Sequence, residues 1–322
     1  MRAWVLYDAG GPGQLRLTEL PTPEPCDGEV LIRIRAFGIN RSELFTRQGH
    51  SPGVVFPRVL GIECVGEVVA APGTDLRPGQ RVAALMGGMG RDFDGGYAEY
   101  TRAPRRCVVP VDCNLPWTTL GAIPEMLQTA AGSLRVGLAC EPGDSLLIRG
   151  GTSSIGRMAA ALAREQGLTV FATTRSEAKG AVLRADGSAV IVDSGSIEPA
   201  ARAARPDGFD RVLELVGTQT LLDSLRCARV GGVVCMTGIL GGSWVLPNFQ
   251  PMGDIPHGVR LTMYSGGPED LTEADLAGFC AAVQAGRAEV PIDRVFAFDE
   301  LVAAHEHMEG NRARGKIVIA GA

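Results

Sequence analysis

Hydrophobic and polar residues alternate in short runs over the first hundred or so positions, and Gly and Pro separate the runs. The runs are GEVLIRIRAFGIN (28–40), GIECVGEVVAA (61–71), GQRVAAL (79–85) and RRCVVPV (105–111). Alternating or β-branched segments of about six residues between turn signals are typical of strands. The N-terminal part is therefore expected to form a partly open β-barrel.

From about Pro124 the pattern changes to apolar runs that alternate with helical periods. We predict strands at 145–149, 169–173, 189–193, 211–215 and 233–237, and helices at 124–137, 155–166, 176–185, 197–204 and 219–228. Apolar strands that alternate with helices indicate a parallel sheet covered on both faces. This part is expected to be a doubly wound nucleotide-binding domain.

A Gly- and Pro-rich stretch (238–256) precedes the last elements, which are a strand near 259–263, a helix at 273–285 and the segment GKIVIAG (315–321). These are too few for a third domain, so we expect them to pack back onto the first. The predicted fold class is α/β, with residues 1–122 as the barrel domain, 123–260 as the nucleotide-binding domain and 261–322 completing the first.

The composition is that of an ordinary globular protein and excludes several classes of function. The 322 residues suit about two domains, and 45% are hydrophobic and 21% charged. A net charge of -5 with scattered Lys and Arg does not favour nucleic acid as a partner. The apolar runs are too short to cross a membrane, and the N-terminus does not resemble a signal peptide. We expect a cytoplasmic protein whose eight cysteines, with no C-x-x-C pair, are mostly buried thiols.

The segment IRGGTSSIGRMAAALAREQG (148–167) lies where the first strand turns into a helix. Gly151, Ser153 and Gly156 stand at the three glycine positions of a G-x-G-x-x-G fingerprint. The first Gly permits a tight turn and the last lets the helix pack closely, while Ser adds only a hydroxyl. Backbone N–H groups at such a helix start can hold a pyrophosphate. The sequence therefore predicts a dinucleotide-binding turn.

The end of the second predicted strand indicates which dinucleotide is bound. An NAD site has an Asp or Glu about 20 residues past the turn, but here the chain reads FATTRSEAK, with Thr174, Arg175 and Lys179. Hydroxyl and cationic groups at this place could bind a 2′-phosphate, and no acid there is expected to repel it. This favours NADPH. The alternative is that Ser176 only caps the next helix and that both cations are solvated.

Motifs spread over nearly the whole chain together resemble one family, the zinc-independent quinone oxidoreductases related to zeta-crystallin, within the medium-chain dehydrogenase/reductases. The motifs are FGINRSELFTRQG (37–49), PRVLGIECVGEVVAAPGTDLRPGQRV (57–82), GGYAEY (95–100), the turn, and AHEHMEGNRARGKIVI (304–319). The resemblance implies a GroES-like barrel, an inserted Rossmann domain, NADPH between them and commonly a homodimer.

The resemblance also implies site residues. Asn40 would contact the nicotinamide or the substrate, unless it is only a turn residue, and Arg47 would border the cleft; we expect these two to be catalytic. The expected cofactor contacts are Asn40, Thr129, Gly151, Thr152, Ser153, Ser154, Ile155, Gly156, Thr174, Arg175, Lys179, Val216, Gly217 and Gly238.

Zinc-dependent relatives carry a Cys where this chain has Asn40 and a His where it has Ile62. They also have a four-Cys lobe where this chain passes directly from RVAALMGG to GGYAEY. Isoleucine cannot ligate a metal and Asn is a poor zinc ligand, so we expect no zinc site. His305 and His307 are two apart on a predicted helix and do not form a metal pair.

Two departures from the family concern the substrate. Relatives often have a Tyr where this chain has Phe45. They often have a second Tyr, near the 2′-phosphate, where this chain has Asp193. An apolar acceptor pocket is predicted, and the residues expected to line it are Phe45, Met86, Met89, Phe93, Trp244 and Phe249. The alternative is that these side chains only pack in the protein interior.

These observations favour an NADPH-dependent, zinc-independent reductase that transfers hydride to a quinone or an α,β-unsaturated carbonyl, with protonation from solvent. One alternative is a tailoring or trans-acting enoyl reductase in a biosynthetic pathway. The other is a protein that binds NADPH without turnover.

Overall fold

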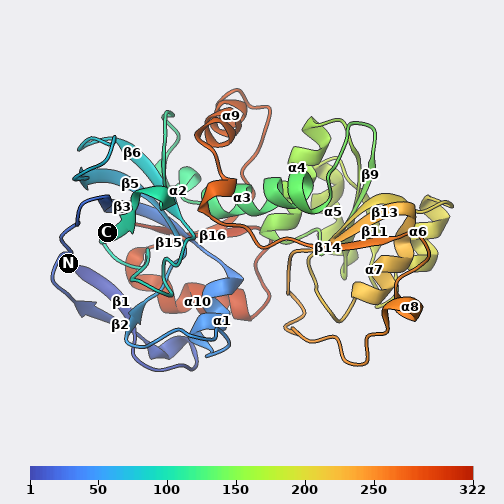
Figure 1. Cartoon of the computed structure of the whole chain (residues 1–322), viewed down its shortest axis with the longest axis horizontal. Helices are drawn as coiled ribbons and strands as arrows, with labels where there is room; N and C mark the ends of the chain where they lie inside the picture. The colour runs from blue at the N-terminus through green and yellow to red at the C-terminus, as the bar shows by residue number, and fades with distance from the viewer. Residues whose placement is uncertain (322) are drawn as a thin grey trace. The chain divides into compact units, whose positions relative to one another are not determined.

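A computed structural model describes residues 1–321, and the chain divides into two compact units (Figure 1). Unit 1 comprises Met1–Gln128 together with the chain from Gly267 onward, and unit 2 comprises Thr129–Gly266. Both boundaries lie six residues later than predicted, at 128 instead of 122 and at 266 instead of 260. The first falls inside helix α3 (Pro124–Gly132), which continues into a π-helical turn at Ser133–Gly137.

Unit 1 is built around a largely antiparallel sheet. Its order is β15 (Ile292–Phe296), β16 (Lys316–Ala320), β3 (Glu29–Ile39), β5 (Glu63–Ala70), β6 (Arg81–Leu85) and β8 (Val108–Pro110), and β7 (Tyr100–Pro104) also pairs with β3. Ile317 of β16 lies opposite Ile39 of β3. The last strand of the chain therefore completes the N-terminal sheet, and the predicted α/β class with a GroES-like barrel is confirmed.

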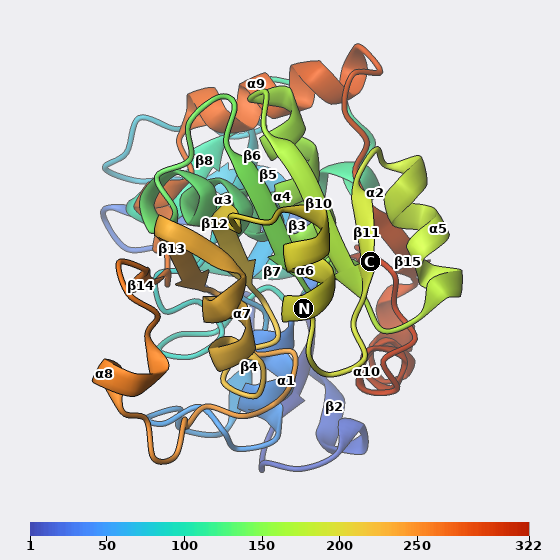
Figure 2. The ribbon, with the colours of Figure 1, turned by 90° about the vertical axis from the view of Figure 1, so that its right-hand side faces the viewer.

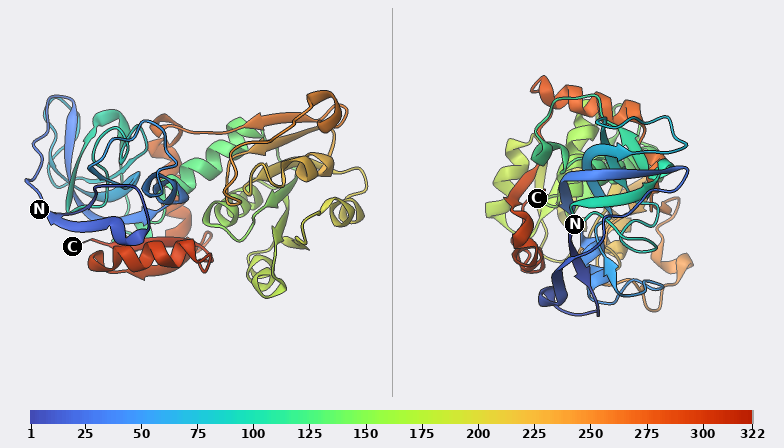
Figure 3. Two further views of the ribbon diagram at one scale, coloured as in Figure 1. Left: turned by 90° about the horizontal axis from the view of Figure 1, so that it is seen from below. Right: turned by 90° about the vertical axis from the view of Figure 1, so that its left-hand side faces the viewer.

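A smaller sheet and short helices complete unit 1. The sheet has the order β2 (Leu15–Glu19), β1 (Arg2–Leu6), β4 (Arg58–Val59), and the helices are α1 (Arg41–Arg47), α2 (Trp117–Leu120), α9 (Glu273–Gln284) and α10 (Leu301–Glu309). Helix α10 lies beside the N-terminal strands (Figure 3). Trp4 Nε1 donates to the Phe298 carbonyl at 2.9 Å, and the Phe37 ring stacks on Tyr97 with centroids 5.0 Å apart. One core thus joins both ends of the chain.

Unit 2 contains a parallel sheet (Figure 2). Its order is β11 (Ala189–Val192), β10 (Thr169–Thr174), β9 (Ser145–Arg149), β12 (Phe209–Glu214), β13 (Ala228–Met236) and β14 (Arg260–Met263), and its helices are α4 (Ser154–Glu165), α5 (Glu177–Ala185), α6 (Glu198–Ala204), α7 (Leu221–Cys227) and α8 (Pro251–Asp254). Right-handed crossovers on a sheet whose order reverses at β9 place α4 and α5 on one face and α6 and α7 on the other. This is the doubly wound topology predicted for the segment.

One predicted element lies in a different unit from the one expected. The strand near 259–263 was expected to pack onto the first domain, but β14 pairs in parallel with β13 and belongs to the sheet of unit 2. Cys235 lies opposite Thr262, whose hydroxyl donates to the Gly137 carbonyl at 2.6 Å. Within the described chain, no helix is long and apolar enough to span a membrane.

Candidate functional site

Unit 1 contains a buried cluster of charged and amide side chains around Asn40. Lys316, at the start of β16, places its ammonium 2.5 Å from Glu63 Oε1 and 3.2 Å from Glu125 Oε2, and it donates to Asn40 Oδ1 at 2.5 Å. Glu43 of α1 completes the cluster. Lys316, Glu63 and Glu43 are each at most 1% exposed, and Asn40 is 8% exposed. The cluster therefore joins α1 with its cap residue, β5, α3 and β16 in a largely buried site.

The chemistry of the neighbours fixes the orientation of the Asn40 amide. An ammonium can only donate, so the amide oxygen must face Lys316. The amide nitrogen then faces carboxylates, and it lies 3.0 Å from Glu63 Oε1 and 3.3 Å from Glu43 Oε1. The Asn40 backbone N–H also donates to Glu43 Oε2 at 3.1 Å, which anchors the start of α1. Asn40 thus stands at the N-cap position of α1, where the alternative was a turn residue, and is also a member of the cluster.

Burial and neighbouring charges together shift the pKa values of two members of the cluster, Glu43 and Lys316. Burial raises the pKa of Glu43 to about 7, although hydrogen bonds such as that from the Ile62 N–H and the Lys316 charge oppose the rise. Burial alone would lower the pKa of Lys316, but the charges of Glu63 and Glu125 outweigh it and raise that pKa. Near neutral pH the cluster therefore contains a charged ammonium and one carboxyl, Glu43, that holds a proton to a much higher pH than an exposed glutamate does.

Of the five members of this cluster, only Asn40 was predicted from the sequence as a site residue; Glu43, Glu63, Glu125 and Lys316 were not. One signal in the sequence was the glycine Gly38 inside the apolar run AFGI. In the structure this position has no room for a side chain, because a Cβ there would overlap Glu63 Oε1 and Lys316 Cε. A lysine between Gly315 and the apolar run IVIA was a second signal. A cation at the start of a buried strand requires a buried counter-charge.

Arg47 does not lie where it was expected. Its side chain is fully buried, and the guanidinium donates to the Gly10 carbonyl, to Glu309 Oε1 at 2.5 Å and to His305 Nδ1 at 3.3 Å. His305 Nε2 lies 3.1 Å from the Tyr97 hydroxyl. In this structure Arg47 ties α1 to α10 inside unit 1, which corrects the expectation that it borders a cleft as a catalytic residue.

In unit 2 the segment Gly150–Gly156 forms the turn predicted between β9 and α4. Ser153 caps α4, since its hydroxyl accepts from the Gly156 N–H at 3.1 Å. A Cβ on Gly151 would lie 2.7 Å from Ala172 Cβ, and a Cβ on Gly156 would lie 2.7 Å from the Gly150 carbonyl oxygen. Only glycine fits at these two positions, whereas position 153 uses its side chain to cap the helix.

The turn leaves backbone donors available for a ligand. Within residues 1–321 the N–H groups of Thr152, Ser154 and Ile155 have no acceptor, and they lie at the positive end of the α4 dipole. An anion such as a pyrophosphate fits this arrangement. The expected contacts of these residues with a cofactor stay a prediction.

Other predicted cofactor residues lie at the carboxyl ends of β12 and β13. The buried carboxylate of Glu214 accepts from the N–H groups of Val216 and Gly217 at 2.7 and 2.9 Å, and its backbone carbonyl accepts from the Gly238 N–H at 3.1 Å. A Cβ on Gly238 would overlap the Leu215 carbonyl. Glu214, which the sequence analysis missed, therefore holds these loops together. Thr129 lies half-buried in α3.

The predicted phosphate-binding residues lie at the end of β10. Thr174 is buried and its hydroxyl accepts from the Ser176 N–H at 3.3 Å, Arg175 is exposed, and Lys179 is half-buried on α5. One carboxylate does lie in this segment: Glu177, which forms an ion pair with Arg184 at 2.6 Å. The sequence prediction assumed that this segment has no acidic residue, and it overlooked Glu177. The ion pair with Arg184 balances the negative charge of Glu177.

The residues of the predicted acceptor pocket lie in both units. Met89 is fully buried, so it is a packing residue, and Trp244 is 58% exposed. Phe45, Met86 and Phe249 are half-buried.

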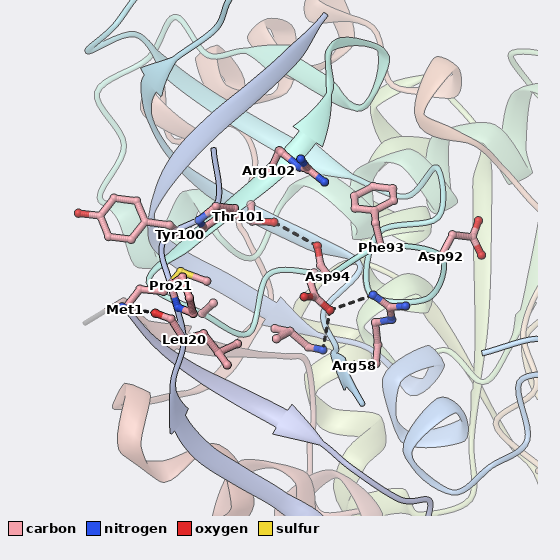
Figure 4. Close-up of a pocket in the computed structure, with 14 residues that line it drawn as sticks. Met1, Leu20, Pro21, Arg58, Asp92, Phe93, Asp94, Tyr100, Thr101 and Arg102 are labelled. Atoms are coloured by element: carbon pink, nitrogen blue, oxygen red, sulfur yellow. Dashed lines mark hydrogen bonds and ion pairs between the residues drawn. The ribbon is translucent and has the colours of Figure 1, made fainter. Parts of the chain in front are cut away.

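Of the predicted acceptor residues, Phe93 is the one that lines a pocket of about 450 Å³ in unit 1 (Figure 4). There Arg58 Nη1 donates to Asp94 Oδ1 at 2.9 Å, and Tyr100 and Leu20 form other parts of the wall. The other five predicted acceptor residues do not line it.

Two family models match this chain. The alcohol dehydrogenase GroES-like domain matches residues 26–113, and a model described as zinc-binding dehydrogenase matches residues 187–319. The human quinone oxidoreductase is 26% identical over 331 residues, which cover 99% of this chain and 97% of that protein. The 2-haloacrylate reductase of a Burkholderia species is 28% identical over 336 residues, with 98% of each chain covered.

A solved structure of an alcohol dehydrogenase superfamily protein from Novosphingobium aromaticivorans has a TM-score of 0.87, 27% identity and 99% coverage of both chains. Together with the barrel and the doubly wound sheet, these likenesses define a two-domain dehydrogenase/reductase, an oxidoreductase class. The chain is therefore similar over nearly its whole length to quinone oxidoreductases, and its two matched segments are an alcohol dehydrogenase GroES-like domain and a zinc-binding dehydrogenase domain.

The metal named in the family-model description has no matching ligands at the two aligned positions. Ile62 is buried and has no donor atom in its side chain, and the Asn40 oxygen is taken by the Lys316 ammonium. No cluster of three or more His, Cys, Asp or Glu side chains suited to a metal ion occurs among residues 1–321. The donor set at this place therefore suits an internal ammonium and does not suit zinc.

Proposed function

We propose that this protein is an NADPH-dependent reductase that transfers hydride to a quinone or an α,β-unsaturated carbonyl. The observation that carries the proposal is the edge of the unit 2 sheet, where three unpaired N–H groups of the turn (Thr152, Ser154 and Ile155) accompany the exposed Arg175. The three N–H groups are suited to bind a pyrophosphate, and the guanidinium of Arg175 is suited to bind a 2′-phosphate.

The residues of the chain have distinct roles in this proposal. When bound, the nicotinamide ring supplies the hydride. The turn and the loops held by Glu214 bind and orient the dinucleotide, while Arg175 and Lys179 select the phosphorylated form. Quinone oxidoreductase and 2-haloacrylate reductase among the relatives support an electron-poor C=C or quinone acceptor.

Asn40 and its neighbours support reduction over metal-assisted alcohol oxidation. A zinc alkoxide mechanism needs a Lewis acid held by thiolate and imidazole ligands. Here the aligned positions offer an amide already bound to Lys316 and an apolar side chain. Reduction of an activated acceptor needs no such ligand, since the negative charge develops on a conjugated oxygen that hydrogen bonds can stabilise.

The acceptor is tested by following NADPH absorbance against a panel of quinones and enones. We expect turnover with at least one acceptor, and no turnover with any of them would refute the proposed reaction. Tight NADPH binding without turnover would instead support a protein that only binds the cofactor.

The cofactor is tested by the variant Arg175→Ala. It should raise the Kd for NADPH by about tenfold or more and leave that for NADH nearly unchanged, because a charged hydrogen bond to phosphate is worth about 1.5–3 kcal/mol. Arg184→Ala is the control, since Arg184 lies on the helix α5 that follows Arg175 and is paired with Glu177. Equal effects of Arg175→Ala on both cofactors would refute the assignment.

A further inference from the structure

Arg149 is a buried arginine at the end of β9, directly before the dinucleotide-binding turn. Its side chain is fully buried, and its guanidinium binds Asp193 in a two-pronged arrangement, with Nε 3.0 Å from Oδ2 and Nη2 3.1 Å from Oδ1. Nη1 donates to Asp223 Oδ2 at 2.6 Å. The remaining residues of β9 are buried and none is charged, so this arginine is not explained by the packing of the strand.

Asp193 stands at the edge of the sheet where the 2′-phosphate is proposed to bind. It follows β11, and its N–H donates to the Thr174 carbonyl at 2.8 Å. Thr174 directly precedes Arg175, and the neighbouring Thr173 carbonyl accepts from the Gly151 N–H at 3.0 Å. The carboxyl ends of β9, β10 and β11 thus place the Asp193 carboxylate one strand away from the proposed phosphate ligand.

A second branch of hydrogen bonds connects Arg149 to the loop that follows β12. Nη1 also donates to Ser224 Oγ at 3.3 Å, and that hydroxyl donates to Glu214 Oε2 at 2.5 Å. The other oxygen of Glu214 accepts from the N–H groups of Val216 and Gly217. One guanidinium therefore connects three segments at the carboxyl edge of the sheet.

We propose that Arg149 is a positioning residue that sets the cofactor specificity, by neutralising Asp193 beside the 2′-phosphate position. The proposal rests on the NADPH-dependent function proposed above. An acidic side chain at this edge favours the free 2′-hydroxyl of NADH and repels a phosphate. Arg149 binds both oxygens of Asp193 and also pairs with Asp223, so it reduces the repulsion that Asp193 exerts on a phosphate held by Arg175.

The test compares the Kd values of NADPH and NADH by calorimetric titration, which needs no turnover. Arg149→Met should weaken NADPH about tenfold more than NADH, as expected for one unscreened charge at roughly 10 Å. Adding Asp193→Asn to this variant should restore the ratio of the two Kd values. Equal losses for both cofactors in Arg149→Met, or no restoration in the double variant, would overturn the proposal and leave Arg149 a purely structural residue.

Two further variants keep the proposal testable if Arg149→Met does not fold. Arg149→Lys retains the charge without the fork, so the ratio should stay within about threefold of that of the parent protein while both affinities fall. Asp193→Asn alone should also leave the ratio within about threefold, since the carboxylate is already neutralised. A tenfold gain in NADPH preference in Asp193→Asn would overturn the proposal.

Failure of the cofactor assignment itself has a different signature. A parent protein that binds NADH as tightly as NADPH refutes the proposed function before any variant is made. A parent protein that prefers NADPH, with variants that do not change the ratio, refutes only the role of Arg149.

Discussion

Replacement of Lys316 by Met removes the ammonium of the buried cluster and keeps a flexible unbranched side chain. Lys316 makes three short contacts there, with Glu63 at 2.5 Å, Asn40 at 2.5 Å and Glu125 at 3.2 Å. Without it, the fully buried Glu63 has no counter-charge, and the least costly response is to take up a proton. At pH 7 that uptake costs about 4 kcal/mol, because each pH unit above the ordinary pKa adds about 1.4 kcal/mol.

This estimate agrees with the cost of about 3–5 kcal/mol for breaking a buried ion pair. It also carries a pH signature. In the variant the folded-state pKa of the carboxyl is raised, so the variant regains stability as the pH falls towards the unfolded pKa. The destabilisation by Lys316→Met should therefore shrink by about 1.4 kcal/mol for each unit between pH 7.5 and 5.5.

Urea unfolding followed by tryptophan fluorescence measures the effect. Trp4 and Trp117 lie in unit 1 and Trp244 in unit 2, so a Trp244→Phe background makes the signal report unit 1. The double variant Lys316→Met/Glu63→Gln is the matched control, and it should recover most of the loss and remove its pH dependence. A loss below about 1 kcal/mol, or one that is equal at both pH values, would refute the reasoning.

Three further expectations follow from the same structure. Gly156→Ala should weaken dinucleotide binding by about tenfold or more in a titration, because its Cβ would contact the Gly150 carbonyl, whereas Gly278→Ala in open space on α9 should stabilise by about 0.5–1 kcal/mol. The raised pKa of Glu43, about 7, means that the stability it contributes is lost as the pH rises from about 4.5 to 7, so Glu43→Gln should flatten the unfolding free energy over that window. Burial lowers the pKa of His305 to about 3, so stability should fall between about pH 6.5 and 3, and His305→Gln should reduce that slope; an unchanged slope would contradict the assignment.

The elements of unit 2 could be predicted because their signals are local. The strand at 145–149 matches β9, and the helix at 155–166 differs from α4 by one residue at each end. Apolar runs, the turn residues and the Ala-rich helix are all contained in short windows. The unit boundary at 128 could not be found in this way, since it lies inside one continuous helix with no change in composition.

The buried charges could not be predicted because their partners are distant in the chain. Lys316 and Glu63 are brought together by the pairing of β16 with β3 and of β3 with β5, which no local pattern reveals. Arg47 was misplaced for the same reason, because its partners His305 and Glu309 lie on the C-terminal helix α10. Arg149 stands at the end of an apolar strand, and only the fold shows the two carboxylates that hold it there.

The division of unit 1 between the two ends of the chain has a consequence during synthesis on the ribosome. Gln128 and Lys316 are separated by all of unit 2 and by the part of unit 1 from Gly267 to Gly315, a stretch that at the usual elongation rate takes roughly 10 to 40 seconds to make. Throughout that interval the edge of β3 that pairs with β16 lacks this partner, and Glu63 lacks the positive charge of Lys316. An unpaired strand edge is a site for association with other chains. The nascent protein is therefore open to association through β3 until the last strand of the chain emerges.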